Sequence, residues 1–134
     1  ACRVMKKFLT LIASLLFTAA AFAGSAKVAD ISQTELQAAI ASKSAVILDV
    51  NGTDSYKAGH IPGAIDYIAH KDQIASLLPA DKNALVVAYC ANPACTAYRA
   101  AANAAVKLGY TNVKHYAPGI AGWKKSGAPV EKGS

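Results

Sequence analysis

The sequence predicts an α/β domain built on a mainly parallel sheet with helices on both faces. Two continuous apolar runs rich in β-branched residues, Ala45–Val50 and Ala84–Tyr89, have the pattern of strands buried on both sides. Segments of helical pattern lie between and after them, and the alanine-rich Thr96–Leu108 is the longest. Strands that alternate with helices indicate a parallel sheet, because each parallel crossover needs a connecting segment that is usually helical.

The first half of the domain begins with Lys27–Asp30, which we expect to form a short edge strand. A capping box at Ser32–Glu35 predicts a helix that runs to about Ser42, since the two side chains satisfy each other's backbone N–H groups. The first buried strand follows. A turn at Gly59–Gly63 then leads into a second short strand, Ala64–Ile68.

The second half repeats the alternation. Its expected elements are, in order, a helix at Lys71–Leu78, a strand at Ala84–Tyr89, a helix at Thr96–Leu108, a strand at Val113–Tyr116 and a short helix at Ile120–Lys125. Pro79 ends the first of these helices, because proline cannot continue a helix. Gly109 caps the second, because glycine readily adopts the left-handed conformation found at helix ends.

The N-terminal residues have the pattern of a secretory signal peptide, which we assign to residues 5–23. Lys6 and Lys7 precede an apolar stretch, and Ala21-Phe22-Ala23 supplies the small residues that signal peptidase recognises. The apolar stretch from Phe8 to Ala23, about 16 residues, is shorter than the roughly 20 of a membrane span. We therefore expect a periplasmic or secreted domain over residues 24–134, without stable membrane insertion after cleavage. Residues 1–4 are interpreted as an upstream remnant.

Charge and cysteine content exclude several classes of protein. The formal net charge of +6 falls to +3 once Arg3, Lys6 and Lys7 leave with the N-terminal segment, and the remaining lysines are scattered. This pattern does not indicate a nucleic-acid partner. Cys90 and Cys95 alone form neither a disulfide scaffold nor a four-ligand zinc site, and the histidines are isolated, so we expect no metal and no cofactor.

Cys90 lies where the second buried strand ends and a loop begins. Sites in parallel α/β sheets collect at the carboxyl ends of the strands. Backbone N–H groups of such a loop and of the next helix tend to form a partly positive nest, which stabilises a thiolate or persulfide. The alternative is that Cys90 is a small buried hydrophobic residue.

The motifs around Cys90 resemble those of the rhodanese family. An amino-terminal motif combines Leu48-Asp49-Val50, Tyr56 and Gly59-His60-Ile61-Pro62-Gly63-Ala64-Ile65. Tyr89-Cys90 matches the strand end that bears the family's catalytic cysteine. A carboxyl-terminal motif consists of Gly119, Trp123, Gly127, Pro129 and Val130. The resemblance covers residues 32–130 and implies the rhodanese-like fold, a small parallel sheet of five strands.

The resemblance also implies that Cys90 carries sulfur as a persulfide. The implied partners are a small donor, such as thiosulfate or polysulfide, and a thiol acceptor; the oligomeric state stays open. The implied substrate-binding loop consists of Ala91, Asn92, Pro93, Ala94, Cys95, Thr96, Ala97, Tyr98 and Arg99.

This loop departs from the common family pattern, Cys-x-x-Gly-x-Arg followed by Ser or Thr. Counted from Cys90, Pro93 and Cys95 replace the Gly and the Arg. Counted back from Gly109, the loop is lengthened and the Arg is again absent. That arginine helps to hold anionic donors, so strong thiosulfate activity is in doubt. Arg99 either leans toward the loop or is an exposed helix charge. Asn51 and Ser55 replace a common ion pair, which we interpret as structural drift.

Cys95 is the most informative departure. Two thiols in one tight loop can approach, since a disulfide needs Cα atoms roughly 4.4 to 6.8 Å apart. Cys95 could attack a persulfide on Cys90, share its sulfur, or stay reduced and fill space. Three classes of function remain: a sulfurtransferase or sulfur carrier, a thiol–disulfide redox module that uses Cys90 and Cys95, and an inactive rhodanese-fold binding module.

Three further residues are expected to serve the structure. Asp49 ends a buried strand and should cap the following turn through backbone N–H groups. His60 lies in the Gly-His-Ile-Pro-Gly turn and is interpreted as stabilising that turn rather than as a general base. Trp123 is expected in the core.

Overall fold

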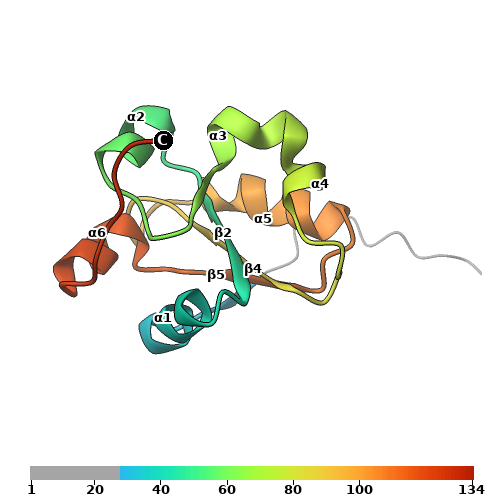
Figure 1. Ribbon diagram of the computed structural model, residues 1–134, viewed down its shortest axis with the longest axis horizontal. Coiled ribbons are helices and arrows are strands. Elements are labelled where there is room, and N and C mark those ends of the chain that lie inside the picture. Colours follow the sequence, from blue (N-terminus) through green and yellow to red (C-terminus); the bar gives the residue numbers. More distant parts are fainter. Residues whose placement is uncertain (1–27) are drawn as a thin grey trace, which may run out of the picture.

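The computed structural model describes residues 28–134 and is shown in Figure 1. The signal peptide predicted at residues 5–23, the remnant at residues 1–4 and Lys27 lie outside the described residues. Within residues 28–134, no helix is both long enough and apolar enough to cross a membrane.

A sheet of five parallel strands forms the centre of the domain, as predicted. The strands are β1 (Ala29–Asp30), β2 (Ala45–Asp49), β3 (Ile65–Asp66), β4 (Leu85–Tyr89) and β5 (Asn112–His115). Their order in space is β1-β5-β4-β2-β3. β4 is the middle strand, and Asp49 at the end of β2 pairs with Tyr89 at the end of β4. The carboxyl ends of β2 and β4 therefore lie side by side.

Helices cover both faces of the sheet. They are α1 (Gln33–Ala41), α2 (Thr53–Ala58), α3 (Tyr67–His70), α4 (Ile74–Leu77), α5 (Tyr98–Lys107) and α6 (Gly119–Lys125), with a 3-10 turn at Lys71–Gln73 between α3 and α4. Figure 1 shows α3, α4 and α5 above the sheet and α1 below it.

Each face of the sheet has its own hydrophobic core, because successive strand residues point to opposite sides. In β4, Val86 and Ala88 pack toward the core that contains Ile74 and Ala101. Val87 and Tyr89 pack toward the core that contains Leu36, Ile61 and Trp123. The apolar run is therefore continuous because β4 is buried on both sides.

Several predicted boundaries need correction. The strand predicted at Ala64–Ile68 ends at Asp66, whose side chain accepts a hydrogen bond from the Ala69 N–H (3.2 Å) and so starts α3 as its N-cap. The helix predicted at Lys71–Leu78 is instead a 3-10 turn followed by α4. The helix predicted from Thr96 begins at Tyr98.

Helix α2 was not predicted. It begins after Gly52, whose φ of 91° favours glycine, and it buries none of its residues. The capping box of α1, in contrast, is present as predicted: the Glu35 N–H donates to Ser32 Oγ (3.2 Å), and the Ser32 N–H donates to Glu35 Oε2 (3.0 Å).

Candidate functional site

Cys90 is the first residue after β4 and lies at the carboxyl end of the sheet, as expected. Its exposed fraction is 1 %. The next nine residues form the loop and the start of α5, and most of their side chains are exposed. The structure thus places a buried sulfur atom beneath an exposed loop.

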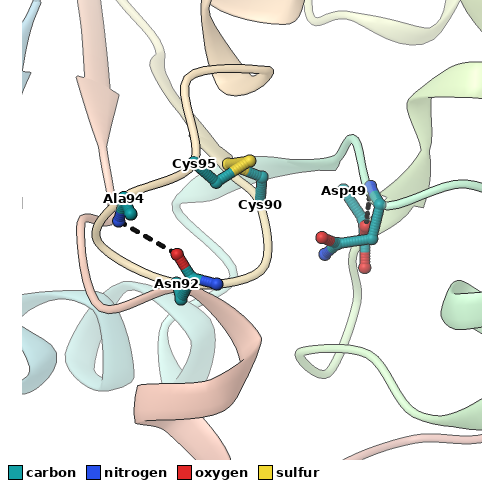
Figure 2. Close-up of a disulfide and its surroundings, with 6 residues drawn as sticks. Asp49, Cys90, Asn92, Ala94 and Cys95 are labelled. Atoms are coloured by element: carbon teal, nitrogen blue, oxygen red, sulfur yellow. Dashed lines mark hydrogen bonds between the residues drawn. A yellow bond between two sulfur atoms is a disulfide. The ribbon is translucent and has the colours of Figure 1, made fainter.

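The loop turns back on itself at Asn92. The Ala94 N–H donates to Asn92 Oδ1 (2.9 Å), and the Cys95 N–H donates to the Asn92 carbonyl oxygen (3.1 Å). This turn returns Cys95 to Cys90, so that their Cα atoms are 6.2 Å apart and their Sγ atoms form a disulfide. Figure 2 shows this bond between Cys90 and Cys95, with Asn92 and Ala94 at the far end of the loop.

The N-terminus of α6 donates hydrogen bonds to the first two residues of this segment. The Ile120 N–H donates to the Cys90 carbonyl oxygen (2.9 Å), and the Ala121 N–H donates to the Ala91 carbonyl oxygen (2.9 Å). Gly119 has a φ of 64°, and a Cβ there would lie 2.6 Å from the Cys90 carbonyl oxygen. This close approach explains why a glycine is required at position 119 and links the carboxyl-terminal motif to the cysteine.

Backbone donors are available at the start of α5. The N–H groups of Thr96, Ala97 and Tyr98 have no acceptor within residues 28–134. Such groups carry partial positive charge and can stabilise an anion. Residues 91–98 contain no acidic side chain that would oppose a thiolate or persulfide.

Asp49 lies beside the cysteine loop, on the neighbouring strand end (Figure 2). Its Oδ1 accepts from the Asn51 N–H (2.8 Å), and its Oδ2 accepts from the Tyr89 hydroxyl. Burial raises the pKa of the Asp49 carboxyl, although the hydrogen bond from Tyr89 acts in the opposite direction. The Tyr89 hydroxyl also accepts from the Ile61 N–H (3.1 Å), so this group ties three segments together beneath the site.

Two residues near this end of the sheet were not identified from the sequence as part of the site. The Tyr89-Cys90 motif places Tyr89 at the strand end, but the sequence does not predict that its hydroxyl donates to Asp49. Asn51 was interpreted as drift, but its buried Nδ2 has no acceptor among the described residues. The replacement therefore leaves a free amide donor one residue beyond the Val50–Tyr89 backbone bond.

Tyr98 and Arg99 line a groove that also includes Pro93 of the loop. The groove has a volume of about 600 Å³ and is also lined by His115. The Tyr98 ring stacks on the His115 ring, with centroids 3.4 Å apart. Cys90 and Cys95 are not among the lining residues.

His60 and Trp123 hold the carboxyl-terminal segment. His60 Nδ1 lies 2.7 Å from the Tyr56 carbonyl oxygen, and its Nε2 lies 3.6 Å from Glu131 Oε2. Trp123 is 1 % exposed, and its Nε1–H donates to the Pro129 carbonyl oxygen (2.7 Å). The partners in these contacts are Tyr56, Glu131 and Pro129, so the contacts support the fold rather than the cysteine chemistry.

Among the described residues, no group of three or more His, Cys, Asp or Glu side chains could hold an ion. Cys90 and Cys95 offer the chemistry of two thiols or, when oxidised, of the disulfide between them, in a loop that also contains backbone N–H groups without acceptors among the described residues.

Comparisons with known proteins agree with this geometry. The family model for the rhodanese-like domain matches residues 32–126. An HTH-type transcriptional regulator of Mycobacterium tuberculosis is 35% identical over 89 residues. The match spans 66% of this chain but only 38% of the regulator.

Solved structures show the same fold. Thiosulfate sulfurtransferase from Pseudomonas aeruginosa has a TM-score of 0.62 and 27% identity, over 80% of this chain and 21% of that one. The human single-domain sulfurtransferase TSTD1 has a TM-score of 0.55 and 24% identity, over 72% and 95%. A rhodanese-related protein from Thermoplasma volcanium has a TM-score of 0.59 and 23% identity, over 77% and 97%.

The family model covers most of the chain, and the parallel five-stranded sheet and the motifs around Cys90 agree with it. The chain belongs to the family of rhodanese-like domains.

Proposed function

We propose that this protein is a sulfurtransferase of the cell envelope that carries sulfane sulfur as a persulfide on Cys90 and passes it to a thiol acceptor. The observation that carries the proposal is the position of Cys90 at the carboxyl end of β4 in a rhodanese-like domain, where it begins the segment whose Thr96, Ala97 and Tyr98 N–H groups have no acceptor among the described residues. Such donors stabilise the anionic sulfur of a thiolate or persulfide. The envelope location rests on the signal peptide expected at residues 5–23.

Polysulfide is the donor that the loop favours over thiosulfate. Residues 91–98 contain no arginine or lysine, and Arg99 lines the neighbouring groove. Thiosulfate is a compact dianion whose oxyanion end is best held by a guanidinium fork. A polysulfide presents a chain of sulfur atoms to the nucleophile and needs no such fork.

The proposal is tested by sulfur loading of the reduced protein. All variants carry Cys2→Ser, so that only the loop cysteines can take sulfur. Each is reduced with a dithiol, desalted without oxygen, and treated with thiosulfate or polysulfide before intact-mass measurement. We expect addition of sulfur from polysulfide to the Cys95→Ser variant, and none to Cys90→Ser. If the Cys95→Ser variant takes sulfur from neither donor, the proposal is wrong.

A thiol–disulfide redox module is the second candidate, and the Cys90–Cys95 bond favours it. Such a module exchanges its disulfide with dithiols and never forms a persulfide. A reversible disulfide in the wild type, together with a Cys95→Ser variant that gains no sulfur from polysulfide, would support this candidate.

A further inference from the structure

The disulfide joins the proposed sulfur carrier to a neighbour in its own loop. We propose that Cys95 resolves the persulfide on Cys90, so that the domain reduces sulfane sulfur to sulfide instead of storing it. The inference rests on the proposed function, because the persulfide on Cys90 is its starting point.

The reaction is a thiol–disulfide exchange within the loop. The Cys95 thiolate attacks Cys90 Sγ, which is the inner sulfur of the persulfide. A bond forms between the two Sγ atoms, and the bond from Cys90 Sγ to the outer sulfur breaks. The electron pair leaves with the outer sulfur, which takes the proton given up by the Cys95 thiol and departs as hydrosulfide. The two cysteines are oxidised by two electrons, and the sulfane sulfur is reduced by two.

The geometry needed for this attack is already present. The two Sγ atoms are bonded in the structure, so Cys95 reaches Cys90 Sγ with the backbone as it stands. The Asn92 turn holds it there through its two hydrogen bonds, one to the Ala94 N–H and one to the Cys95 N–H. A tethered nucleophile acts at a high effective concentration, so Cys95 can react with the persulfide faster than an external thiol acceptor does.

The two cysteines differ in exposure, and this difference suits the step in which an external dithiol reduces the disulfide back to two thiols. Cys90 is 1 % exposed, whereas Cys95 is only partly buried. An external dithiol therefore meets Cys95 first and forms a mixed disulfide with it. Cys90 leaves as a thiolate at the start of the loop that also contains the free N–H groups of Thr96, Ala97 and Tyr98. The second thiol of the reductant then releases Cys95, and both protein thiols are restored while the dithiol is oxidised.

The overall reaction consumes a sulfane-sulfur donor and a dithiol reductant and yields sulfide. The class of partner that the inference requires is thus a dithiol reductant that can reach an exposed loop. A sulfurtransferase whose Cys90 acts alone would instead hold its sulfur until an acceptor thiol arrives.

The test follows the fate of the sulfur in reduced variants that all carry Cys2→Ser. Each is given an equal amount of polysulfide without oxygen, and intact mass and sulfide are followed with time. We expect the otherwise wild-type loop to lose two hydrogens and release one hydrosulfide per chain beyond that measured with Cys95→Ser. Cys95→Ser should keep its added sulfur, with a lifetime at least about tenfold longer, since the tethered thiol is gone.

A matched control keeps two thiols but separates them. Cys95→Ser/Asn83→Cys places the second thiol at the opposite end of β4, where Asn83 is exposed. We expect this variant to hold the persulfide as Cys95→Ser does. Rapid sulfide release from it would overturn the inference, because a thiol outside the loop would then suffice.

The outcomes separate the inference from the proposed function. A persulfide that persists in the intact loop without excess sulfide overturns the resolving role of Cys95 and leaves the carrier proposal standing. Absence of added sulfur in Cys95→Ser overturns the carrier proposal itself. A Cys90→Ser variant that gains sulfur on Cys95 would reverse the roles assigned to the two residues.

Discussion

Gly119 shows how a single residue controls the shape of the cysteine loop. We expect Gly119→Ala to displace the loop, because the new Cβ would lie 2.6 Å from the Cys90 carbonyl oxygen and 2.7 Å from the Asn92 nitrogen. The free energy of unfolding should fall by at least about 1–3 kcal/mol, the cost of a non-glycine residue held in a sparsely populated backbone region. Denaturant unfolding measures the loss, and polysulfide loading of Cys90 should slow.

Gly127→Ala is the matched control for this prediction. Gly127 has a φ of 79° but no neighbouring atom within 4 Å, so the substitution adds backbone strain without a clash. We expect it to lower stability less than Gly119→Ala and to leave sulfur loading intact. Equal effects of the two variants would show that close packing beneath the loop does not matter.

The lowered pKa of His115 should make the stability of the fold depend on pH. Burial lowers the pKa of its imidazole below the usual 6.5, while Asp30, 3.1 Å from Nδ1, acts in the opposite direction. Because the folded state binds the proton less tightly than the unfolded chain does, the free energy of unfolding should rise with pH. This rise should occur from the lowered pKa up to about 6.5.

The Asp30→Asn variant tests this explanation. Loss of the carboxylate should lower the pKa of His115 further, as measured by an NMR titration of the imidazole protons. Asp72→Asn, an exposed aspartate in the 3-10 turn, serves as the charge-matched control and should have no effect. An unchanged or raised pKa in Asp30→Asn would contradict the assigned role of Asp30.

Individual site residues could be predicted when a local motif contains them. Cys90 and Gly119 were identified in this way, although the structure alone gives the reason for Gly119. Contacts between residues distant in sequence could not be predicted: Tyr98 stacks on His115, and the Tyr89 hydroxyl donates to Asp49. Side-chain periodicity contains no information about such pairs.

At the level of elements, the loop disulfide should stabilise the fold only modestly. A bond that closes a loop of this length, from Cys90 to Cys95, removes chain entropy worth about 2 kcal/mol, less than a bond across a long loop would. We expect reduction to lower the free energy of unfolding by about that amount and to lower the melting temperature by on the order of 10 °C. The domain should remain folded when reduced, as a reversible redox step requires.

Denaturant unfolding of the oxidised and reduced protein provides the measurement. Cys95→Ala should match the reduced wild type, since it lacks the bond but keeps the loop length. If reduction unfolds the domain, the disulfide is a structural staple and cannot take part in a catalytic cycle.

The elements that could be predicted are those whose own sequence determines them. β2 and β4 are continuous apolar runs, and α1 has its capping box. Helix α2 has no such pattern, because it buries none of its residues and so needs no apolar stripe. β3 is shorter than predicted because Asp66 caps the next helix, and a capping side chain can end an apolar run early.

At the scale of the whole molecule, one sheet separates two hydrophobic cores. The order of the strands in this sheet could not be deduced from the spacing of the strands along the sequence. The pattern of strands and helices predicts a parallel sheet, but the order β1-β5-β4-β2-β3 depends on contacts between distant segments. The residue pattern predicts five strands, and the resemblance to rhodaneses implies the same number. This order makes β4 the middle strand, so Cys90 follows the end of the middle strand and the end of β2 lies to one side of the site.

The carboxyl-terminal segment closes the core that contains Trp123. Trp123 Nε1–H donates to the Pro129 carbonyl oxygen (2.7 Å), Val130 packs against the same core, and the backbones of His60 and Glu131 exchange two hydrogen bonds (2.9 and 3.0 Å). A chain that ends at Gly127 loses all of these contacts. It also leaves the buried Trp123 Nε1–H without an acceptor, and an unpaired buried donor alone costs about 1–3 kcal/mol.

We expect the truncated chain to be less stable by at least about 2 kcal/mol, since the unpaired indole donor and the lost packing of Val130 act together. Trp123 is the only tryptophan in the sequence, so its emission reports this core directly and should shift to longer wavelength as water enters. A chain that ends at Glu131 is the control, because it keeps the Pro129 carbonyl and both bonds to His60 and loses only the Gly133 N–H bond to the Lys57 carbonyl oxygen (3.0 Å). If both truncated chains unfold at the wild-type denaturant concentration with unchanged emission, the segment does not support the core. The core that contains Trp123 would then be held by its other members, which come from the strands, α1, α6 and the turn that contains Ile61.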